Sequence, residues 1–174
     1  MFGKRSVFLI GPMGSGKTAV GKQIARRLRM PFIDTDAEIE RRTGADITLI
    51  FEKEGESGFR ERERELIDEL TQLDALVLST GGGAIVLEQN RRALKERGVV
   101  AYLETSIEQQ TVRVMSGRKK RPLVANVANP SQRLAELMQQ RQPLYQQTAD
   151  LSVPTDGRRV SVVADDIIRA LTDR

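Results

Sequence analysis

Residues 11–18 of the chain have the sequence Gly-Pro-Met-Gly-Ser-Gly-Lys-Thr, and the apolar run Val-Phe-Leu-Ile comes directly before them. A segment of the form G-x-x-x-x-G-K-[ST], between a buried strand and a helix, is the pattern of a phosphate-binding loop (P-loop). A tight turn can match this pattern by chance, but here the preceding apolar run and the following helical segment are both present. We therefore expect a strand at 6–10, a loop, a helix at 17–28, and a fold that binds a nucleoside triphosphate.

The residues of this loop have separate roles. Its three glycines let the backbone curl so that consecutive N–H groups face phosphate oxygens, and the following helix adds the positive end of its dipole. Lys17 is expected to reach the β- and γ-phosphates, and the hydroxyl of Thr18 is expected to bind Mg²⁺. The expected nucleotide contacts in this segment are Gly11, Gly14, Ser15, Gly16, Lys17, Thr18 and Ala19.

The composition excludes several kinds of chemistry. The 174 residues include no His and no Cys, which excludes a Ser-His-Asp triad, a cysteine nucleophile, a disulfide framework and a zinc site with His or Cys ligands. A metal must therefore bind to oxygen, which suits Mg²⁺. The net charge of +4 permits nucleic-acid binding, but with two Tyr, five Phe and no Trp the chain has few stacking platforms. We expect no nucleic-acid partner.

The chain also lacks signals for export or membrane insertion. No apolar stretch is long enough to span a membrane, and the first expected strand begins too near residue 1 to leave space for a signal peptide. We expect a monomeric cytoplasmic protein in which residues 1–174 form a single P-loop kinase domain.

Apolar runs alternate with helical patterns along the whole chain. This alternation predicts an α/β fold of the P-loop NTPase type: a three-layer sandwich with a parallel sheet of about five strands and helices on both faces. The predicted strands are 6–10, 32–34, 75–79, 99–103 and 151–153. The predicted helices are 17–28, 37–42, 49–73 with a break near 55–58, 88–97, 107–115, 131–147 and 160–171.

Two stretches do not fit a simple alternation. Residues 35–74 contain more helix than one crossover needs, and we expect the part from about 35 to 62 to form a helical region that binds the phosphate acceptor. Residues 116–130 form a basic segment with Gly and Pro, and a loop of this length in a compact domain is usually functional or disordered. We expect it to be a mobile lid that closes over the site.

Two carboxylates follow the second predicted strand. Asp34 and Asp36 would lie at the carboxyl edge of the sheet, where open α/β folds bind their ligands. The third strand runs into Ser79 and Thr80 with no acid at its end, so Asp34 is the candidate that completes the Mg²⁺ shell, through water. Asp36 would face the acceptor. The competing interpretation is that one of the two acids only caps the next helix.

Glycines 81–83 and three arginines complete the candidate site. A triple glycine at the end of a strand permits a close backbone approach to a ligand, although a flexible turn would have the same sequence. Arg60, Arg121 and Arg141 each have planar guanidinium groups suited to carboxylate or phosphate oxygens. Arg141 comes two residues before Pro143, which is expected to disturb its helix and fix the direction of the arginine. Each arginine taken singly could be an ordinary surface residue.

In order and spacing, these motifs resemble those of the shikimate kinase family. The resemblance extends from about residue 7 to the last helix. The P-loop is common to many NTPases, whereas the ordered combination is much more specific. Besides the loop, the motifs are Asp34-Thr35-Asp36, Gly58-Phe59-Arg60 followed by Glu63, Gly81-Gly82-Gly83, Arg121-Pro122-Leu123 and Arg141-Gln142-Pro143-Leu144-Tyr145.

The resemblance implies ATP-dependent phosphorylation of the 3-hydroxyl of shikimate, on the route to chorismate and the aromatic amino acids, with Mg²⁺ as cofactor. By this likeness Asp36 would bind ring hydroxyls, Arg60 and Arg141 would hold the carboxylate, and the N–H of Gly82 would touch the substrate. Arg121, on the lid, would meet the ATP phosphates.

The catalytic residues implied by the likeness are Lys17, Asp34 and Arg121. Asp34 would attend the metal, and the sequence leaves open whether it also accepts the hydroxyl proton. The adenine contact is open among Arg113, Arg158 and Arg159, with Arg158 chosen here.

Two other functions fit parts of the pattern. One is a different small-molecule kinase on the same scaffold, acting on a sugar acid or a nucleoside monophosphate. The other is a nucleotide-binding regulatory module without turnover, but the chain has no Asn-Lys-x-Asp motif for guanine and no acid at the end of its third strand.

Overall fold

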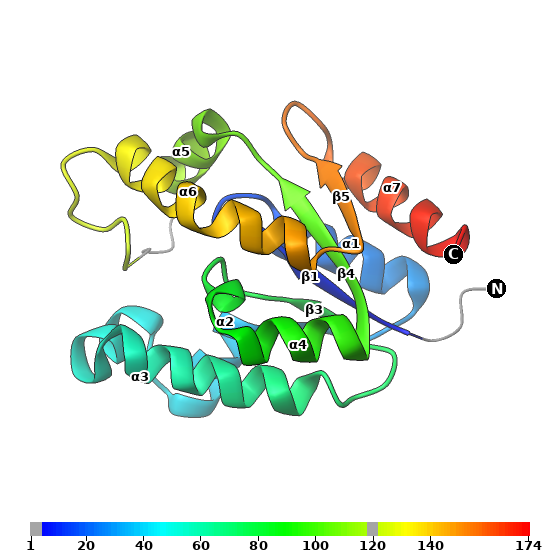
Figure 1. Ribbon diagram of the computed structural model, residues 1–174, viewed down its shortest axis with the longest axis horizontal. Helices are drawn as coiled ribbons and strands as arrows, with labels where there is room; N and C mark the ends of the chain where they lie inside the picture. The colour runs from blue at the N-terminus through cyan, green and yellow to red at the C-terminus, as the bar shows by residue number, and fades with distance from the viewer. Residues whose placement is uncertain (1–4, 118–121) are drawn as a thin grey trace.

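The computed structural model describes residues 5–117 and 122–174, and its centre is a parallel sheet of five strands (Figure 1). Neighbouring strands follow the order β2-β3-β1-β4-β5, so the P-loop strand is central. All four pairings are parallel. The strands are β1 (Ser6–Ile10), β2 (Phe32–Asp34), β3 (Val77–Ser79), β4 (Gly98–Glu104) and β5 (Leu151–Pro154). The predicted α/β sandwich with a five-stranded parallel sheet is confirmed.

Helices cover both faces of the sheet (Figure 1). One apolar cluster packs α1 and α7 on one face, and another packs α3, α4 and α6 on the opposite face. The helices are α1 (Lys17–Leu28), α2 (Thr35–Thr43), α3 (Ile47–Leu70), α4 (Glu88–Arg97), α5 (Ile107–Ser116), α6 (Pro130–Thr148) and α7 (Val160–Thr172), with a 3₁₀ turn η1 (Ala84–Val86). None of the helices within residues 5–117 and 122–174 has the length and apolar character needed to cross a membrane.

The strand β1 shows why its sequence is apolar at every position. Val7 and Leu9 belong to the cluster under α1 and α7, whereas Phe8 and Ile10 belong to the cluster on the other face. Because successive side chains of a strand point to opposite faces, a central strand covered on both sides needs an unbroken apolar run. This burial fixes the strand whose end leads into the P-loop.

One predicted strand bound and one predicted helix distortion differ from the structure for local backbone reasons. The third strand begins at Val77 rather than at residue 75, because Ala75 has a left-handed φ of 54° and forms part of the preceding turn. The helix α6 continues through Pro143 instead of being disturbed there. Pro143 and Gln139, whose carbonyl loses the helical N–H donor, both lie on the exposed side of α6, where water can satisfy that carbonyl.

The two stretches that interrupt the alternation have different structures. The first, between β2 and β3, forms α2 and α3, and α3 is kinked at Gly55 (φ 72°, ψ −179°), as the glycines of 55–58 predicted. In the second, residues 116–117 and 122–130 are described. There Val124 packs with Leu134 and Leu137 of α6, so this part of the predicted lid lies against the helix.

Candidate active site

The P-loop encloses the ammonium group of its own lysine. Nζ of Lys17 donates hydrogen bonds to the carbonyl oxygens of Gly11 at 2.7 Å and Pro12 at 2.9 Å, and it lies 3.4 Å from Oγ of Ser15. Gly16 begins α1 with a left-handed φ of 89°, a conformation that favours glycine. The loop therefore places a cation and the amino end of α1 at the same point, which is the arrangement that binds phosphate.

The open side of the loop is one wall of a nucleotide-sized pocket. Among the P-loop residues expected to contact a nucleotide, five line this pocket, whereas Gly11 and Ser15 are buried and do not line it. Those five are Gly14, Gly16, Lys17, Thr18 and Ala19. Across the pocket lie the ends of β2 and β3 with the glycines that follow, so the pocket occupies the carboxyl edge of the sheet.

Thr18 and Asp34 meet at this edge. The hydroxyl of Thr18 donates to Oδ2 of Asp34 at 2.8 Å, and Oδ1 of Asp34 accepts from the backbone N–H of Ala37 at 3.0 Å. The helix-capping role weighed for the two acids therefore belongs to Asp34, which nonetheless keeps one oxygen toward the pocket. A hydroxyl and a single carboxylate suit Mg²⁺, which in nucleotide sites takes most of its remaining ligands from phosphates and water. No group of three or more acidic, His or Cys ligands occurs in the described part of the chain.

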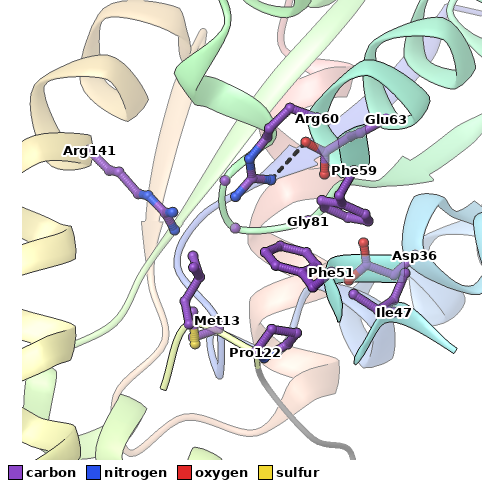
Figure 2. A pocket seen from close by; sticks show the side chains of 13 residues that line it. Met13, Asp36, Ile47, Phe51, Phe59, Arg60, Glu63, Gly81, Pro122 and Arg141 are labelled. Carbon is purple, nitrogen blue, oxygen red and sulfur yellow. Dashed lines mark hydrogen bonds and ion pairs between the residues drawn. The ribbon is translucent and has the colours of Figure 1, made fainter. Parts of the chain in front are cut away.

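A second pocket adjoins the first, and Figure 2 shows its lining. It encloses about 430 Å³ of space between atoms, part of it open to solvent. All four residues expected to bind the acceptor line it, namely Asp36, Arg60, Gly82 and Arg141. The two pockets share Met13, Asp36, Gly81 and Gly82, so a ligand in one would lie next to a ligand in the other.

The glycines after β3 are closely packed against two charged side chains and the backbone of the P-loop. A Cβ on Gly83 would lie 2.1 Å from an Nη of Arg60, and a Cβ on Gly81 would lie 2.9 Å from Oε2 of Glu63. A Cβ on Gly82 would approach the backbone nitrogen of Met13 to 3.1 Å. The flexible-turn alternative for this sequence therefore does not hold. The three residues form a tightly packed floor between the two pockets.

Two guanidinium groups from different helices face this floor (Figure 2). Arg60 of α3 donates to Oε1 of Glu63 at 2.9 Å, and its second partner, Glu56, lies at 3.4 Å. Burial, with a smaller contribution from the charge of Arg60, lowers the pKa of Arg141 on α6. Because the two cations repel each other in a partly dehydrated site, the pocket favours an anionic ligand.

Glu63 is a buried acid that the sequence indicated only as part of a motif. Its side chain is 0% exposed, and burial raises its pKa to about 7; the charge of Asp36 adds to the rise, and Arg60 opposes it. Glu63 follows Arg60 by three positions on α3, so the two side chains meet on one face of the helix. The i, i+3 spacing is the signal that would have identified the pair.

Tyr145 is a second residue whose role the sequence did not reveal. Its ring is buried and stacks on Tyr102 with centroids 5.0 Å apart, and its hydroxyl donates to the carbonyl of Gly82 at 2.5 Å. Tyr145 lies one helical turn after Arg141, so a single helix face supplies both groups. The tyrosine thus ties α6 to the glycine floor.

The comparisons with known proteins agree with this arrangement. Residues 13–172 match the family model described as shikimate kinase. The chain belongs to the shikimate kinase family. A curated shikimate kinase of Histophilus somni is 54% identical over 165 residues, which cover 95% of this chain and 94% of the relative. A shikimate kinase of Haemophilus influenzae is 51% identical over 165 residues, covering 95% and 91%.

Solved structures place the chain in the same family. Shikimate kinase from Acinetobacter baumannii in complex with shikimate superposes with a TM-score of 0.95 at 46% identity, covering 99% of this chain and 95% of that one. The enzyme from Aquifex aeolicus gives a TM-score of 0.82 at 33% identity, covering 96% of each chain. A gluconokinase from Sinorhizobium meliloti, at 17% identity and a TM-score of 0.57, shares the fold. The predicted family resemblance is confirmed.

The three arginines considered for the adenine contact lie in different environments. Arg113 lines the nucleotide pocket and donates to the carbonyl of Gly14 at 2.7 Å. Arg158 pairs with Asp166 of α7 and donates to the carbonyl of Pro154 at 2.8 Å. Arg159 is exposed at the start of α7. The choice of Arg158 stays a prediction, and Arg113 is the arginine that the structure places at the P-loop.

Arg121, expected on the lid, lies outside the described residues. The two residues after it, Pro122 and Leu123, line the acceptor pocket. The described part of the predicted lid therefore reaches the acceptor side of the site.

Proposed function

We infer that this member of the shikimate kinase family transfers the γ-phosphoryl group of ATP to the 3-hydroxyl of shikimate. The observation that supports this best is the pair of adjoining pockets. One is built on a P-loop, and the other contains two arginines and an aspartate. A small acceptor with a carboxylate and ring hydroxyls matches the second pocket and lies next to the first.

The acceptor side can hold such a molecule at both ends. The guanidinium groups of Arg60 and Arg141 would bind the carboxylate, because planar forks suit two carboxylate oxygens. Asp36 would accept hydrogen bonds from ring hydroxyls, and it lines both pockets. With the N–H of Gly82, these contacts would fix the reacting hydroxyl toward the P-loop, and such fixed orientation is a large part of the rate of phosphoryl transfer.

The nucleotide side would stabilise the transferring group. Lys17 would contact the β- and γ-phosphates, and Gly11, Gly14, Ser15, Gly16 and Ala19 would surround them. Thr18 and Asp34 would hold Mg²⁺, which when bound neutralises developing phosphate charge. Arg121 would add a further cation as the lid closes.

Asp34 does not need to be a strong base in this scheme. The transition state of phosphoryl transfer is loose, so little proton transfer is required before the bond to phosphorus forms. We propose that Asp34 mainly orients the metal and its water, and that Asp36 aligns the hydroxyl.

A coupled assay of ADP release with Mg²⁺ tests this function. Turnover is expected with shikimate and not with gluconate or a nucleoside monophosphate, and absence of shikimate-stimulated turnover would overturn the proposal. Arg141→Ala should raise the KM for shikimate and leave ATP binding intact. Arg64→Ala, on the outer side of α3 where Arg64 pairs with Glu61, is the matched control and should behave as the wild type.

We propose further that residues 1–174 act as one domain, with an acceptor-binding region at about 35–62 and a lid at about 116–130. The protein would work as a monomer in the cytoplasm without nucleic-acid or membrane partners. Light scattering and cell fractionation test these expectations.

A further inference from the structure

The end of β3 has a buried hydroxyl that the proposed reaction does not yet use. Ser79 is 1% exposed, and its Oγ has no hydrogen-bond partner among the residues that the structure describes. Leaving a buried hydroxyl without a partner is costly, so such groups usually have a ligand, an ion or a water. The next residue, Thr80, differs in this respect, because its hydroxyl donates to the carbonyl of Leu9 at 2.9 Å.

Ser79 lies beside the residues that would hold the metal. It is the cross-strand partner of Asp34 in the β2–β3 pair and of Leu9 in the β3–β1 pair. Val77, two positions earlier, packs in the cluster under α1. Since side chains two positions apart in a strand share a face, Ser79 also points to the α1 side.

Asp34 shares that face by the same rule. Phe32, two positions before it on β2, packs against the cluster under α1. Thr18, in the first turn of α1, donates to Oδ2 of Asp34. Together with Ser79, these two residues line the nucleotide pocket. Three side-chain oxygens from β2, β3 and α1 therefore gather at one wall of the pocket.

We propose that the Ser79 hydroxyl is a third protein contact of the metal site, hydrogen-bonded to a water molecule on the nucleotide-bound Mg²⁺. This inference rests on the proposed function. A water-mediated contact is favoured because Mg²⁺ dehydrates reluctantly and usually keeps several waters. Thr18 would bind the metal through an oxygen lone pair and keep its O–H hydrogen bond to Asp34, and the carboxylate of Asp34 and the hydroxyl of Ser79 would hold metal-bound water.

A serine at this position has a consequence for metal binding. It adds a donor and acceptor without adding a negative charge, so Asp34 supplies the one carboxylate among Thr18, Asp34 and Ser79. Metal should therefore bind mainly together with the nucleotide, whose phosphates supply the missing charge.

Calorimetric titration of ADP, with and without Mg²⁺, tests the proposal on the intact protein. In the wild type, Mg²⁺ should tighten ADP binding. In Ser79→Ala the factor by which Mg²⁺ increases ADP affinity should be about tenfold smaller, because one hydrogen bond to the metal's hydration shell is lost. The affinity for ADP without metal should stay within about twofold of the wild-type value. Ser152→Ala, an exposed serine on β5, is the matched control and should keep the full gain.

Thermal stability provides a second readout. Because Ser79 Oγ has no partner in the described structure, Ser79→Ala should melt at the same temperature as the wild type or higher. Three results for Ser79→Ala would each overturn the proposal. Mg²⁺ could increase ADP affinity as much as in the wild type, ADP affinity could fall equally with and without Mg²⁺, or the melting temperature could clearly drop. If Mg²⁺ did not increase ADP affinity in the wild type, the metal role in the proposed function would be refuted, and this inference with it.

Discussion

Replacing the buried acid Glu63 by glutamine should remove a pH dependence from the stability of the protein. The carboxyl group has its ordinary pKa of 4.5 in the unfolded chain, whereas burial raises the pKa to about 7 in the folded protein. Between these values the folded state keeps a proton that the unfolded state has lost. The free energy of unfolding therefore falls as the pH rises through this window, by about 1.4 kcal/mol per pH unit.

The size of the effect follows from the two pKa values. Integrated from about pH 5.5 to about pH 8, the contribution of Glu63 to the free energy of unfolding falls by about 2 kcal/mol. Glutamine fills nearly the same volume and does not titrate, so Glu63→Gln should lack this part of the fall. All other titrating groups are present in both proteins, so their contributions cancel in the difference.

Urea denaturation of the ligand-free proteins at these two pH values measures the effect. Glu65→Gln, which changes an exposed acid on the same helix, is the control and should show the wild-type pH dependence. If Glu63→Gln lost as much stability as the wild type between the two pH values, Glu63 would be ionised throughout, held so by Arg60, and the reasoning would be wrong.

Two further substitutions test the floor between the pockets. Tyr145→Phe removes the hydrogen bond to the Gly82 carbonyl and should lower kcat/KM for shikimate about tenfold, with ADP affinity unchanged. Tyr102→Phe, in the ring that stacks on it, is the control, and an equal loss there would show that the effect is not specific to the hydrogen bond with Gly82. Gly83→Ala should displace the Arg60 guanidinium, because the new Cβ would lie 2.1 Å from it, and should raise the KM for shikimate at least tenfold. An unchanged KM in steady-state kinetics would refute the role given to that contact.

The parts of the fold that depend on local patterns could be predicted from the sequence. The apolar run of β1, covered by helices on both faces, and the glycine-rich loop after it defined the centre of the sheet. The pocket that contains Arg60 and Arg141 brings together residues 81 positions apart. Periodicity alone does not predict that these two arginines share a site, whereas the order of the family's motifs did. The side chains met because α3 and α6 pack on the same face of the sheet.

Other features depend on tertiary contacts that leave little trace in the sequence. The burial of Glu63 arises only when α3 lies over Gly81, whereas the sequence shows just one acid within the run of charged residues at 61–65. The path of α6 through Pro143 depends on the proline facing outward, which the helix packing decides. Likewise, the position of Arg113 beside Gly14 depends on how α5 approaches the P-loop.

The central claim is that a carboxylate held by Arg60 and Arg141 orients the acceptor toward the P-loop. Comparing shikimate with its methyl ester in the coupled ADP assay tests this most directly, because the ester keeps the ring and hydroxyls and loses only the charge. We expect kcat/KM to fall by about a hundredfold for the ester, as for the loss of a charge-assisted bidentate contact, with the KM for ATP unchanged. Phosphorylation of the ester as efficiently as the acid would contradict the account.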